Sequence, residues 1–314
     1  MKTALLFPGQ GSQYIGMGAE ICSVSQCAKQ VFEYADEVLK ENFSRKMFQG
    51  SESFFDDIRN TQLSIFITSV AVYEAVKEKI PHMQIDVMAG HSLGEYSAMY
   101  AAGVIDLKTG ISLVGKRGKC MQEAANKYPS GMVAVVGEDH EYIFKCVESL
   151  QIPDLYPANV NAYNQIVFSG KKESLEVLLQ AAEQEELRVI PLKVKGGFHS
   201  PFMEEAKDVM QEHLKRQEWK AFQCSVLSNT DGKEYKSQNE IASKLSRQII
   251  LPVQWVFTIE EMIERKIELL VEVGPGKVLT GLSKKIYKQN AARGEFLNVS
   301  DGDELQKLET RVKS

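Results

Sequence analysis

The amino-acid sequence predicts an α/β protein in which a large subdomain carries a smaller inserted one. With 314 residues, the chain exceeds the size at which one hydrophobic core usually stops growing. In its first third, short apolar runs alternate with stretches of helical periodicity, which is typical of a parallel sheet covered by helices. From about residue 129 the order of predicted elements changes, and this change indicates an insertion.

The first part of the large subdomain begins with two buried strands that frame a helix. Residues 3–7 form a short apolar run that a Pro-Gly pair ends, and residues 86–90 form another. Between these runs, residues 61–79 place apolar side chains mostly at helical spacing. The second run leads into a helix-like stretch over residues 92–102. Because strand and helix alternate, both strands are expected in one parallel sheet.

The inserted segment has a different pattern. Its elements are expected in this order: a strand at 131–137, a helix at 140–150, strands at 155–160 and 165–169, a helix at 173–184 and a strand at 187–194. This split βαβ order closes into a ferredoxin-like unit in which the first and last strands are neighbours. The sequence therefore predicts a large subdomain over residues 1–126 and 197–314, with an insertion over residues 127–196.

The large subdomain resumes after the insertion. A long helix is expected over residues 201–219, strands at 225–227 and 267–273, and a further helix at 278–287. The tail from residue 304 to residue 314 is polar, and we expect it to fray. No internal repeat or low-complexity tract interrupts this order.

The composition excludes several classes of protein. Hydrophobic residues make up 44% of the chain and charged residues 25%, which argues against a disordered, fibrous or membrane-embedded protein. Only five apolar or small residues run uninterrupted before Pro8, too few for a secretory signal, so a cytoplasmic location is expected. The five cysteines form no Cys-x-x-Cys pair, and no histidine has ligand spacing, so neither disulfides nor a metal site is predicted. The net charge of −5 gives no general attraction to nucleic acid.

The strongest chemical signal is a Gly-x-Ser-x-Gly motif centred on Ser92. It directly follows a predicted strand and directly precedes a predicted helix, which is the context of a nucleophile elbow. A serine on such a sharp turn needs small neighbours, and Gly90 and Gly94 supply that room. The alternative is a helix-capping serine between two chance glycines. The strand-turn-helix context favours the nucleophile.

A serine nucleophile needs a base, and the five histidines differ in context. The most polar surroundings are those of His82, His140 and His213, which are most simply surface residues. His91 lies inside the elbow itself. His199 follows a predicted strand and two glycines and precedes a proline that starts the next helix, so it is the favoured base. The alternative is a loop histidine that caps the following helix.

The order of serine before histidine agrees with an α/β-hydrolase-like large subdomain. Such a site would also place an acidic residue between them. The candidates Asp139 and Asp154 fall inside the insertion, away from strand ends, so no full triad is apparent.

The glycine-rich turn at residues 7–13 follows the first strand. Its exposed backbone N–H groups suit one arm of an oxyanion hole, although a plain Gly-Pro turn would look the same. The sequence lacks both the phosphate-loop pattern and a full dinucleotide-binding pattern before a helix, so nucleotide binding is set aside.

Several sequence blocks together resemble the malonyl-CoA:acyl carrier protein transacylases. The blocks are FPGQGSQ at 7–13, GHSLGE at 90–95, KRGKCMQ at 116–122, GGFHSP at 196–201, Gln248 ahead of PVQW at 252–255, and GPGKVL at 274–279. They occur in one order across nearly the whole chain, which makes coincidence far less probable than for a single motif.

The resemblance implies roles for the reacting groups. Ser92 takes the acyl group and His199 activates it, while the backbone N–H groups of Gln10 and Leu93 bind the oxyanion. Arg117 pairs with the free carboxylate of malonate, and a planar guanidinium suits a carboxylate better than a lysine does. From the sequence alone, a solvated helix arginine would be the simpler interpretation of this residue.

The resemblance also implies supporting residues. A backbone carbonyl near Gln248 orients the histidine, which would explain the missing triad carboxylate. Phe198 and the Leu93 side chain form a bulky wall that selects malonyl groups. Three further matches are expected to support the site: Gln62, Asn159 and Asn161. Gly197 stands where alanine is usual and Leu251 where asparagine is common, and either change could widen acyl tolerance.

The implied reaction moves malonyl from malonyl-CoA to the phosphopantetheine thiol of an acyl carrier protein, for fatty acid or polyketide chain extension, and needs no bound cofactor. We expect a monomer with neither nucleic acid nor membrane as a partner. One alternative is an acyl hydrolase that clears stalled carrier proteins, but relatives of that kind lack the carboxylate-pairing arginine. Another is a docking protein without chemistry, which would be expected to have lost Ser92 or His199.

Overall fold

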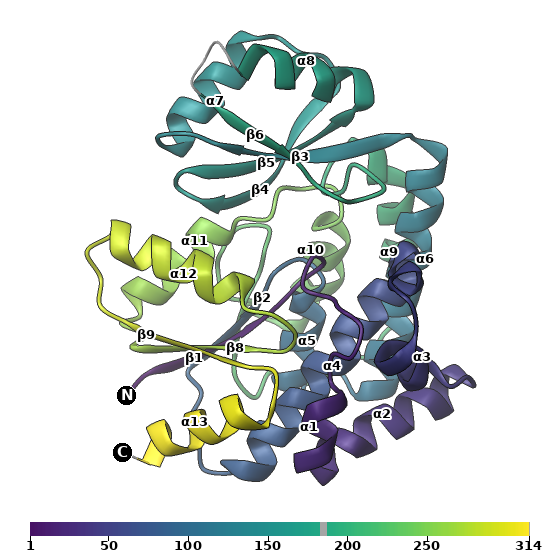
Figure 1. Ribbon diagram of the computed structural model, residues 1–314, viewed down its shortest axis with the longest axis vertical. Coiled ribbons are helices and arrows are strands. Elements are labelled where there is room, and N and C mark those ends of the chain that lie inside the picture. The colour runs from purple at the N-terminus through teal and green to yellow at the C-terminus, as the bar shows by residue number, and fades with distance from the viewer. Residues whose placement is uncertain (183–186, 314) are drawn as a thin grey trace.

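The computed structural model describes residues 1–182 and 187–313 and shows two subdomains with one sheet each (Figure 1). The sheet of the large subdomain has five strands in the order β7-β2-β1-β8-β9, and all neighbours are parallel. Its strands are β1 (Thr3–Phe7), β2 (Val87–Gly90), β7 (Ser225–Leu227), β8 (Leu269–Val273) and β9 (Glu295–Val299). Strand β9 is the only one of these that the sequence pattern did not predict.

Helices cover both faces of this sheet, which explains why its inner strands β2, β1 and β8 are buried throughout and mostly apolar. Ala4 and Leu6 of β1 face a core that includes α11 (Trp255–Glu264) and α12 (Val278–Gln289). Leu5 and Phe7 face the opposite and larger core. The helices of that core are α1 (Ala19–Val24), α2 (Gln26–Leu39), α3 (Phe43–Gln49), α4 (Ile58–Lys79), α5 (Gly94–Ala101), α6 (Leu107–Lys127), α9 (Glu204–Lys215), α10 (Ile241–Arg247) and α13 (Gly302–Lys313). Short 3₁₀ turns at Glu52–Asp56, Pro201–Met203 and Gln238–Glu240 link some of them.

The prediction of a fraying C-terminal tail was wrong. Helix α13 occupies this segment, and Leu305 and Leu308 on one of its faces are buried. They belong to the larger core, where α13 contacts β9, α1 and α4. The helix is polar on average, but two leucines three residues apart are enough to dock one face.

The long helix expected over residues 201–219 is also shorter than predicted. A 3₁₀ turn over Pro201–Met203 comes first, and α9 then ends at Lys215. The predicted helix end at Gln184 and part of the loop after it lie outside the described residues.

The sheet of the small subdomain has four antiparallel strands in the order β4-β5-β3-β6. They are β3 (Ser130–Val136), β4 (Leu155–Ala162), β5 (Gln165–Lys171) and β6 (Arg188–Pro191), and α7 (His140–Ser149) and α8 (Lys172–Ala182) complete the unit. The first and last strands are neighbours, so the predicted ferredoxin-like topology is confirmed. The bounds of the insertion, residues 127–196, stay a prediction.

The small sheet separates its own core from the large subdomain. Val133, Val135 and Phe168 pack with α7 and α8 on one face. Met132 and Val167 on the other face join the core of the large subdomain. Strand β4 also pairs with the segment before α11, since the Val160 N–H donates to the Val253 carbonyl at 2.9 Å. The small sheet therefore covers the carboxyl ends of the parallel strands.

None of the helices in the described part of the chain combines the length and the apolar composition needed to cross a bilayer.

Candidate active site

Ser92 occupies a sharp turn between β2 and α5. Its φ is +51°, a left-handed conformation that costs energy for a residue with a side chain, and α5 begins only at Gly94. The helix start predicted at Ser92 is therefore two residues too early. A Cβ atom on Gly94 would lie 2.0 Å from the carbonyl oxygen of Phe7, and one on Gly90 would lie 1.9 Å from the carbonyl carbon of Gly94. Both glycines are needed for backbone to approach backbone.

Asn229, which follows β7, holds this turn in place. Its Oδ1 accepts a hydrogen bond from the Ser92 N–H at 2.5 Å, and its Nδ2 donates to the Gly90 carbonyl at 2.6 Å. The residue is fully buried. Sequence reasoning missed it, although its position at the carboxyl end of a strand beside β2 is where site residues of parallel sheets gather.

The imidazole of His199 lies between the Ser92 hydroxyl and a backbone carbonyl. The Ser92 Oγ and the His199 Nε2 are 2.8 Å apart, and the His199 Nδ1 is 2.7 Å from the backbone carbonyl oxygen of Gln248. A carbonyl only accepts hydrogen bonds, so Nδ1 carries the proton and Nε2 is free to accept from the serine. Burial, and next the charge of Arg117, lower the pKa of His199 to about 3. The imidazole is therefore neutral at ordinary pH.

Arg117 lies in the buried face of α6, beside Ser92. Its Nη2 donates to the Ser92 Oγ and to the Gln248 Oε1, both at 3.0 Å, and its Nη1 donates to the Gln62 Oε1 at 2.8 Å. The side chain is 1% exposed, and its Nε has no hydrogen-bond partner among the described residues. Burial lowers the pKa of the guanidinium. The site thus holds a buried cation whose direct partners are all neutral groups.

The turn after β1 packs against the elbow. The His91 N–H donates to the Phe7 carbonyl at 3.0 Å, and a Cβ atom on Gly9 would lie 2.4 Å from the His91 carbonyl oxygen. Within the described residues, neither the Gln10 N–H nor the Leu93 N–H donates to another protein group. Both residues line the cavity that also contains Ser92. Two backbone donors are thus available where an oxyanion would form.

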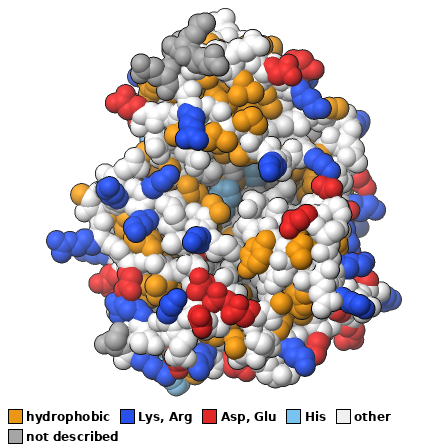
Figure 2. Space-filling model, viewed as in Figure 1, with side chains coloured by type: hydrophobic (Ala, Val, Ile, Leu, Met, Phe, Trp, Pro, Cys, Tyr) orange, Lys and Arg blue, Asp and Glu red, His pale blue; other side chains and the backbone are white. Residues whose placement is uncertain are grey.

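The cavity lies between the two subdomains and has a volume of about 130 Å³. Figure 2 shows histidine side chains in the hollow between the upper and lower parts of the molecule. Nine of the ten residues that the sequence singled out line it: Gln10, Gln62, Ser92, Leu93, Arg117, Asn159, Asn161, Phe198 and His199. Gln248 lies just behind the wall and is 1% exposed. The small subdomain adds apolar lining that the sequence did not reveal: Met132, Val167, Leu192 and Val194.

The asparagines of β4 connect the insertion to the elbow. The Asn161 Oδ1 is 2.9 Å from the His91 Nε2, and the ring of His91 lies 5.5 Å from that of Trp255. Asn159 forms a bridge with Val253. The two subdomains are therefore joined by hydrogen bonds at the edge of the site.

Comparisons with known proteins show the family of this chain. The model of the acyl transferase domain matches residues 4–306. The malonyl CoA-acyl carrier protein transacylase of Bacillus subtilis is 37% identical over 310 residues, which cover 97% of this chain and 95% of that protein. The enzyme of the same name from Haemophilus influenzae is 37% identical over 287 residues, covering 91% of this chain and 92% of its own.

Solved structures are similar over nearly the full length. A malonyl-transacylase in complex with its type II polyketide synthase acyl-carrier protein superposes with a TM-score of 0.93 at 35% identity, covering 99% of this chain and 100% of its own. The malonyl CoA-acyl carrier protein transacylase of Clostridium perfringens superposes with a TM-score of 0.93 at 33% identity. This match covers 100% of this chain and 98% of that protein's chain. Fold and matches together define an acyltransferase. The chain belongs to the acyl transferase family and, within it, to the malonyl CoA-acyl carrier protein transacylases.

Proposed function

We propose that this enzyme moves malonyl from malonyl-CoA to the phosphopantetheine thiol of an acyl carrier protein through an ester on Ser92. The observation that carries the assignment of residues is the position of Arg117. Its buried guanidinium lies 3.0 Å from the Ser92 Oγ and has no carboxylate within bonding distance in the described structure. A malonyl group on Ser92 would supply a carboxylate to pair with the guanidinium of Arg117, whereas an acetyl group would not.

In the first half-reaction, His199 accepts the Ser92 proton while Oγ attacks the thioester carbonyl. The N–H groups of Gln10 and Leu93 stabilise the oxyanion of the tetrahedral intermediate. The intermediate collapses with cleavage of the carbon–sulfur bond, and the imidazolium gives its proton to the leaving coenzyme A thiolate. The hydrogen bond from the His199 Nδ1 to the Gln248 carbonyl keeps the ring oriented throughout.

In the second half-reaction, His199 takes the proton of the carrier protein thiol, and the resulting thiolate attacks the malonyl ester. Collapse of the second tetrahedral intermediate breaks the bond to Oγ, and the proton returns to Ser92. Pairing of Arg117 with the malonyl carboxylate fixes the acyl group so that the incoming thiol has the required geometry. This pairing also argues against the hydrolase alternative, which has no need of a buried cation.

The test is to mix the purified protein with labelled malonyl-CoA or labelled acetyl-CoA and then to add phosphopantetheinylated carrier protein. We expect malonyl label on the wild-type protein, no label on Ser92→Ala, and loss of the preference for malonyl in Arg117→Ala. The label should then pass to the carrier. Rapid loss of label to water with little preference for malonyl would make the protein a hydrolase and overturn the assignment.

We further propose that the enzyme acts as a cytoplasmic monomer. The residues assigned to the site already meet around one cavity within this chain, which supports an enzyme that acts as a single subunit. Light scattering should give a mass near 35.2 kDa. A stable dimer at micromolar concentration would contradict this.

A further inference from the structure

Glu95 is a buried carboxylate that the reaction scheme leaves without a role. It lies on α5, three residues after the nucleophile, and is fully inaccessible to solvent. A carboxylate in such a place is costly unless several hydrogen bonds compensate for lost water. Burial raises its pKa, and hydrogen bonds from Tyr235 and Gln248 oppose that shift.

The donors around Glu95 come from two parts of the chain that are distant from it in sequence, the loop that contains Asn229 and Tyr235 and the end of α10 at Gln248. Its Oε2 accepts from the Gln248 Nε2 at 2.5 Å and from the Asn229 N–H at 3.3 Å, while its Oε1 accepts from the Tyr235 hydroxyl at 2.5 Å. None of these partners is a cation. The carboxylate is therefore held by neutral donors.

Gln248 links Glu95 to the reacting groups. Its Nε2 donates to Glu95 and also to the Ser92 carbonyl at 2.9 Å, so its Oε1 must point the other way, toward Arg117. Its backbone carbonyl orients His199. A flipped amide would place an NH₂ group against the guanidinium and an oxygen against the carboxylate, which are two repulsive contacts. The acidic side chain thus selects the amide orientation that suits the site.

Asn229 is the second link. Its backbone N–H donates to Glu95, and its side chain bonds both ends of the strained turn at Gly90 and Ser92. The same carboxylate therefore contacts the residue that orients the base and the residue that holds the nucleophile.

The charges of Arg117 and Glu95 also favour the observed orientation of the Gln248 amide. Among the described residues, neither Arg117 nor Glu95 forms a direct ion pair. Burial lowers the pKa of Arg117 and the charge of Glu95 raises it, while burial raises the pKa of Glu95 and the charge of Lys244 lowers it. The amide of Gln248 lies between Arg117 and Glu95 with its oxygen on the cation and its nitrogen on the anion. In this orientation the amide dipole is favourable to both charges.

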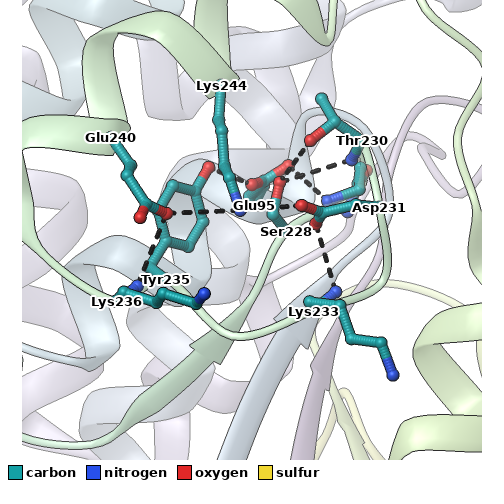
Figure 3. A network of polar contacts seen from close by, with 10 residues as sticks. Glu95, Ser228, Thr230, Asp231, Lys233, Tyr235, Lys236, Glu240 and Lys244 are labelled. Carbon is teal, nitrogen blue, oxygen red and sulfur yellow. Dashed lines mark hydrogen bonds and ion pairs between the residues drawn. The ribbon is translucent and has the colours of Figure 1, made fainter.

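Tyr235 connects Glu95 to charged groups near the surface (Figure 3). The Lys244 Nζ lies 5.1 Å from the centroid of the Tyr235 ring and forms ion pairs with Asp231 at 2.9 Å and Glu240 at 3.3 Å. These contacts hold the ring in place, and so they fix the direction of its hydroxyl.

We propose that Glu95 is a positioning residue whose carboxylate, acting through Gln248 and Asn229, holds the catalytic groups in the geometry needed for acyl transfer. This role rests on the proposed function of the same site. It differs from that of a triad acid because, in the described structure, Glu95 has no hydrogen bond to the imidazole and does not line the cavity.

Glu95→Gln tests the proposal because it keeps the volume and removes the charge and one acceptor. We expect kcat for malonyl transfer to fall about 10- to 100-fold, with KM for malonyl-CoA changed by less than about 3-fold. The rate of Ser92 sulfonylation by phenylmethylsulfonyl fluoride should fall in parallel, because this neutral reagent needs an activated serine but no carboxylate contact with Arg117. Tyr235→Phe, which keeps the charge of Glu95 and loses one donor, should give a smaller fall of the same kind.

Glu272→Gln is the matched control. Glu272 is an equally buried glutamate on β8 that accepts from the backbone N–H groups of Leu279 at 3.1 Å and Thr280 at 2.7 Å. Its substitution should lower the melting temperature by a similar amount and leave sulfonylation unchanged.

Wild-type kcat and sulfonylation in folded Glu95→Gln and Tyr235→Phe would overturn the proposal. If circular dichroism shows that Glu95→Gln does not fold, the kcat and the sulfonylation rate of Tyr235→Phe test the proposal instead. An error in the malonyl assignment would appear separately, as a wild-type protein that is sulfonylated normally but takes up no malonyl label.

Discussion

The Nη2 of Arg117 lies 3.0 Å from the Oγ of Ser92, so a buried cation and the imidazole of His199 meet at one hydroxyl oxygen. This contact has two consequences. It stabilises negative charge that develops on Oγ, and it places the guanidinium where the far end of a short dicarboxylic acyl group would reach. We therefore propose that one side chain, that of Arg117, serves both selectivity for the acyl group and activation of Ser92.

Replacing Arg117 should change substrate preference more than it changes reactivity. In Arg117→Ala, we expect kcat/KM for malonyl-CoA to fall by roughly 100-fold or more, since one partner of a buried charge pair is lost. Turnover of acetyl-CoA should fall far less or rise. Steady-state transfer with both donors measures the ratio. Lys119→Ala, on the exposed face of the same helix, should behave as the wild type. Equal losses for both donors would argue against carboxylate pairing.

The reactivity of Ser92 should persist into acid. The His199 pKa is lowered to about 3, first by burial and then by Arg117, so the base stays neutral well below pH 6.5. The rate constant for sulfonylation in the free enzyme should therefore show no inflection near pH 6.5 on its acid side. Stopped assays with phenylmethylsulfonyl fluoride from about pH 8 to about pH 5 would measure this rate constant at each pH. A tenfold loss per pH unit below 6.5 would mean that the imidazole is solvated.

The same shift makes stability depend on pH. Because the folded-state pKa of His199 lies below its unfolded value, the unfolded chain binds more protons between about pH 3 and about pH 6.5. Its contribution to stability is complete above pH 6.5 and is lost as pH falls toward 3, by at most about 1.4 kcal/mol per unit. Urea unfolding at several pH values should show this slope, and His199→Gln should reduce it. Burial also lowers the pKa of His91, so part of the slope should remain.

At position 92, glycine should give a more stable protein than alanine. Ser92 has φ +51°, which glycine adopts without penalty. Ser92→Gly should therefore be inactive yet more stable than Ser92→Ala by about 1 kcal/mol. Chemical denaturation of both variants measures the difference, and Ser92→Ala is the control because it keeps the strain. Equal stabilities would show that the turn is not strained.

The fold was largely readable from local patterns. The apolar runs at residues 3–7 and 86–90 become β1 and β2, and the order of elements in the insertion produces the ferredoxin-like sheet. The errors lie where packing outweighs composition. Helix α13 is polar on average and docks through Leu305 and Leu308. Strand β9 is partly exposed at the sheet edge, so its pattern is weak.

For the site, the sequence by itself singled out Ser92 and His199, because a strained turn and a close loop require glycines that can be seen in the chain. Its resemblance to the malonyl-CoA:acyl carrier protein transacylases, carried by several sequence blocks, also pointed to other residues that line the cavity. Only the tertiary structure decided how those groups are held. Asn229, Tyr235 and the orientation of Gln248 converge on Glu95 from positions more than 130 residues away, as the separations of 134, 140 and 153 show. A buried hydrogen-bond network depends on which distant donors meet one carboxylate, and no local pattern carries that information.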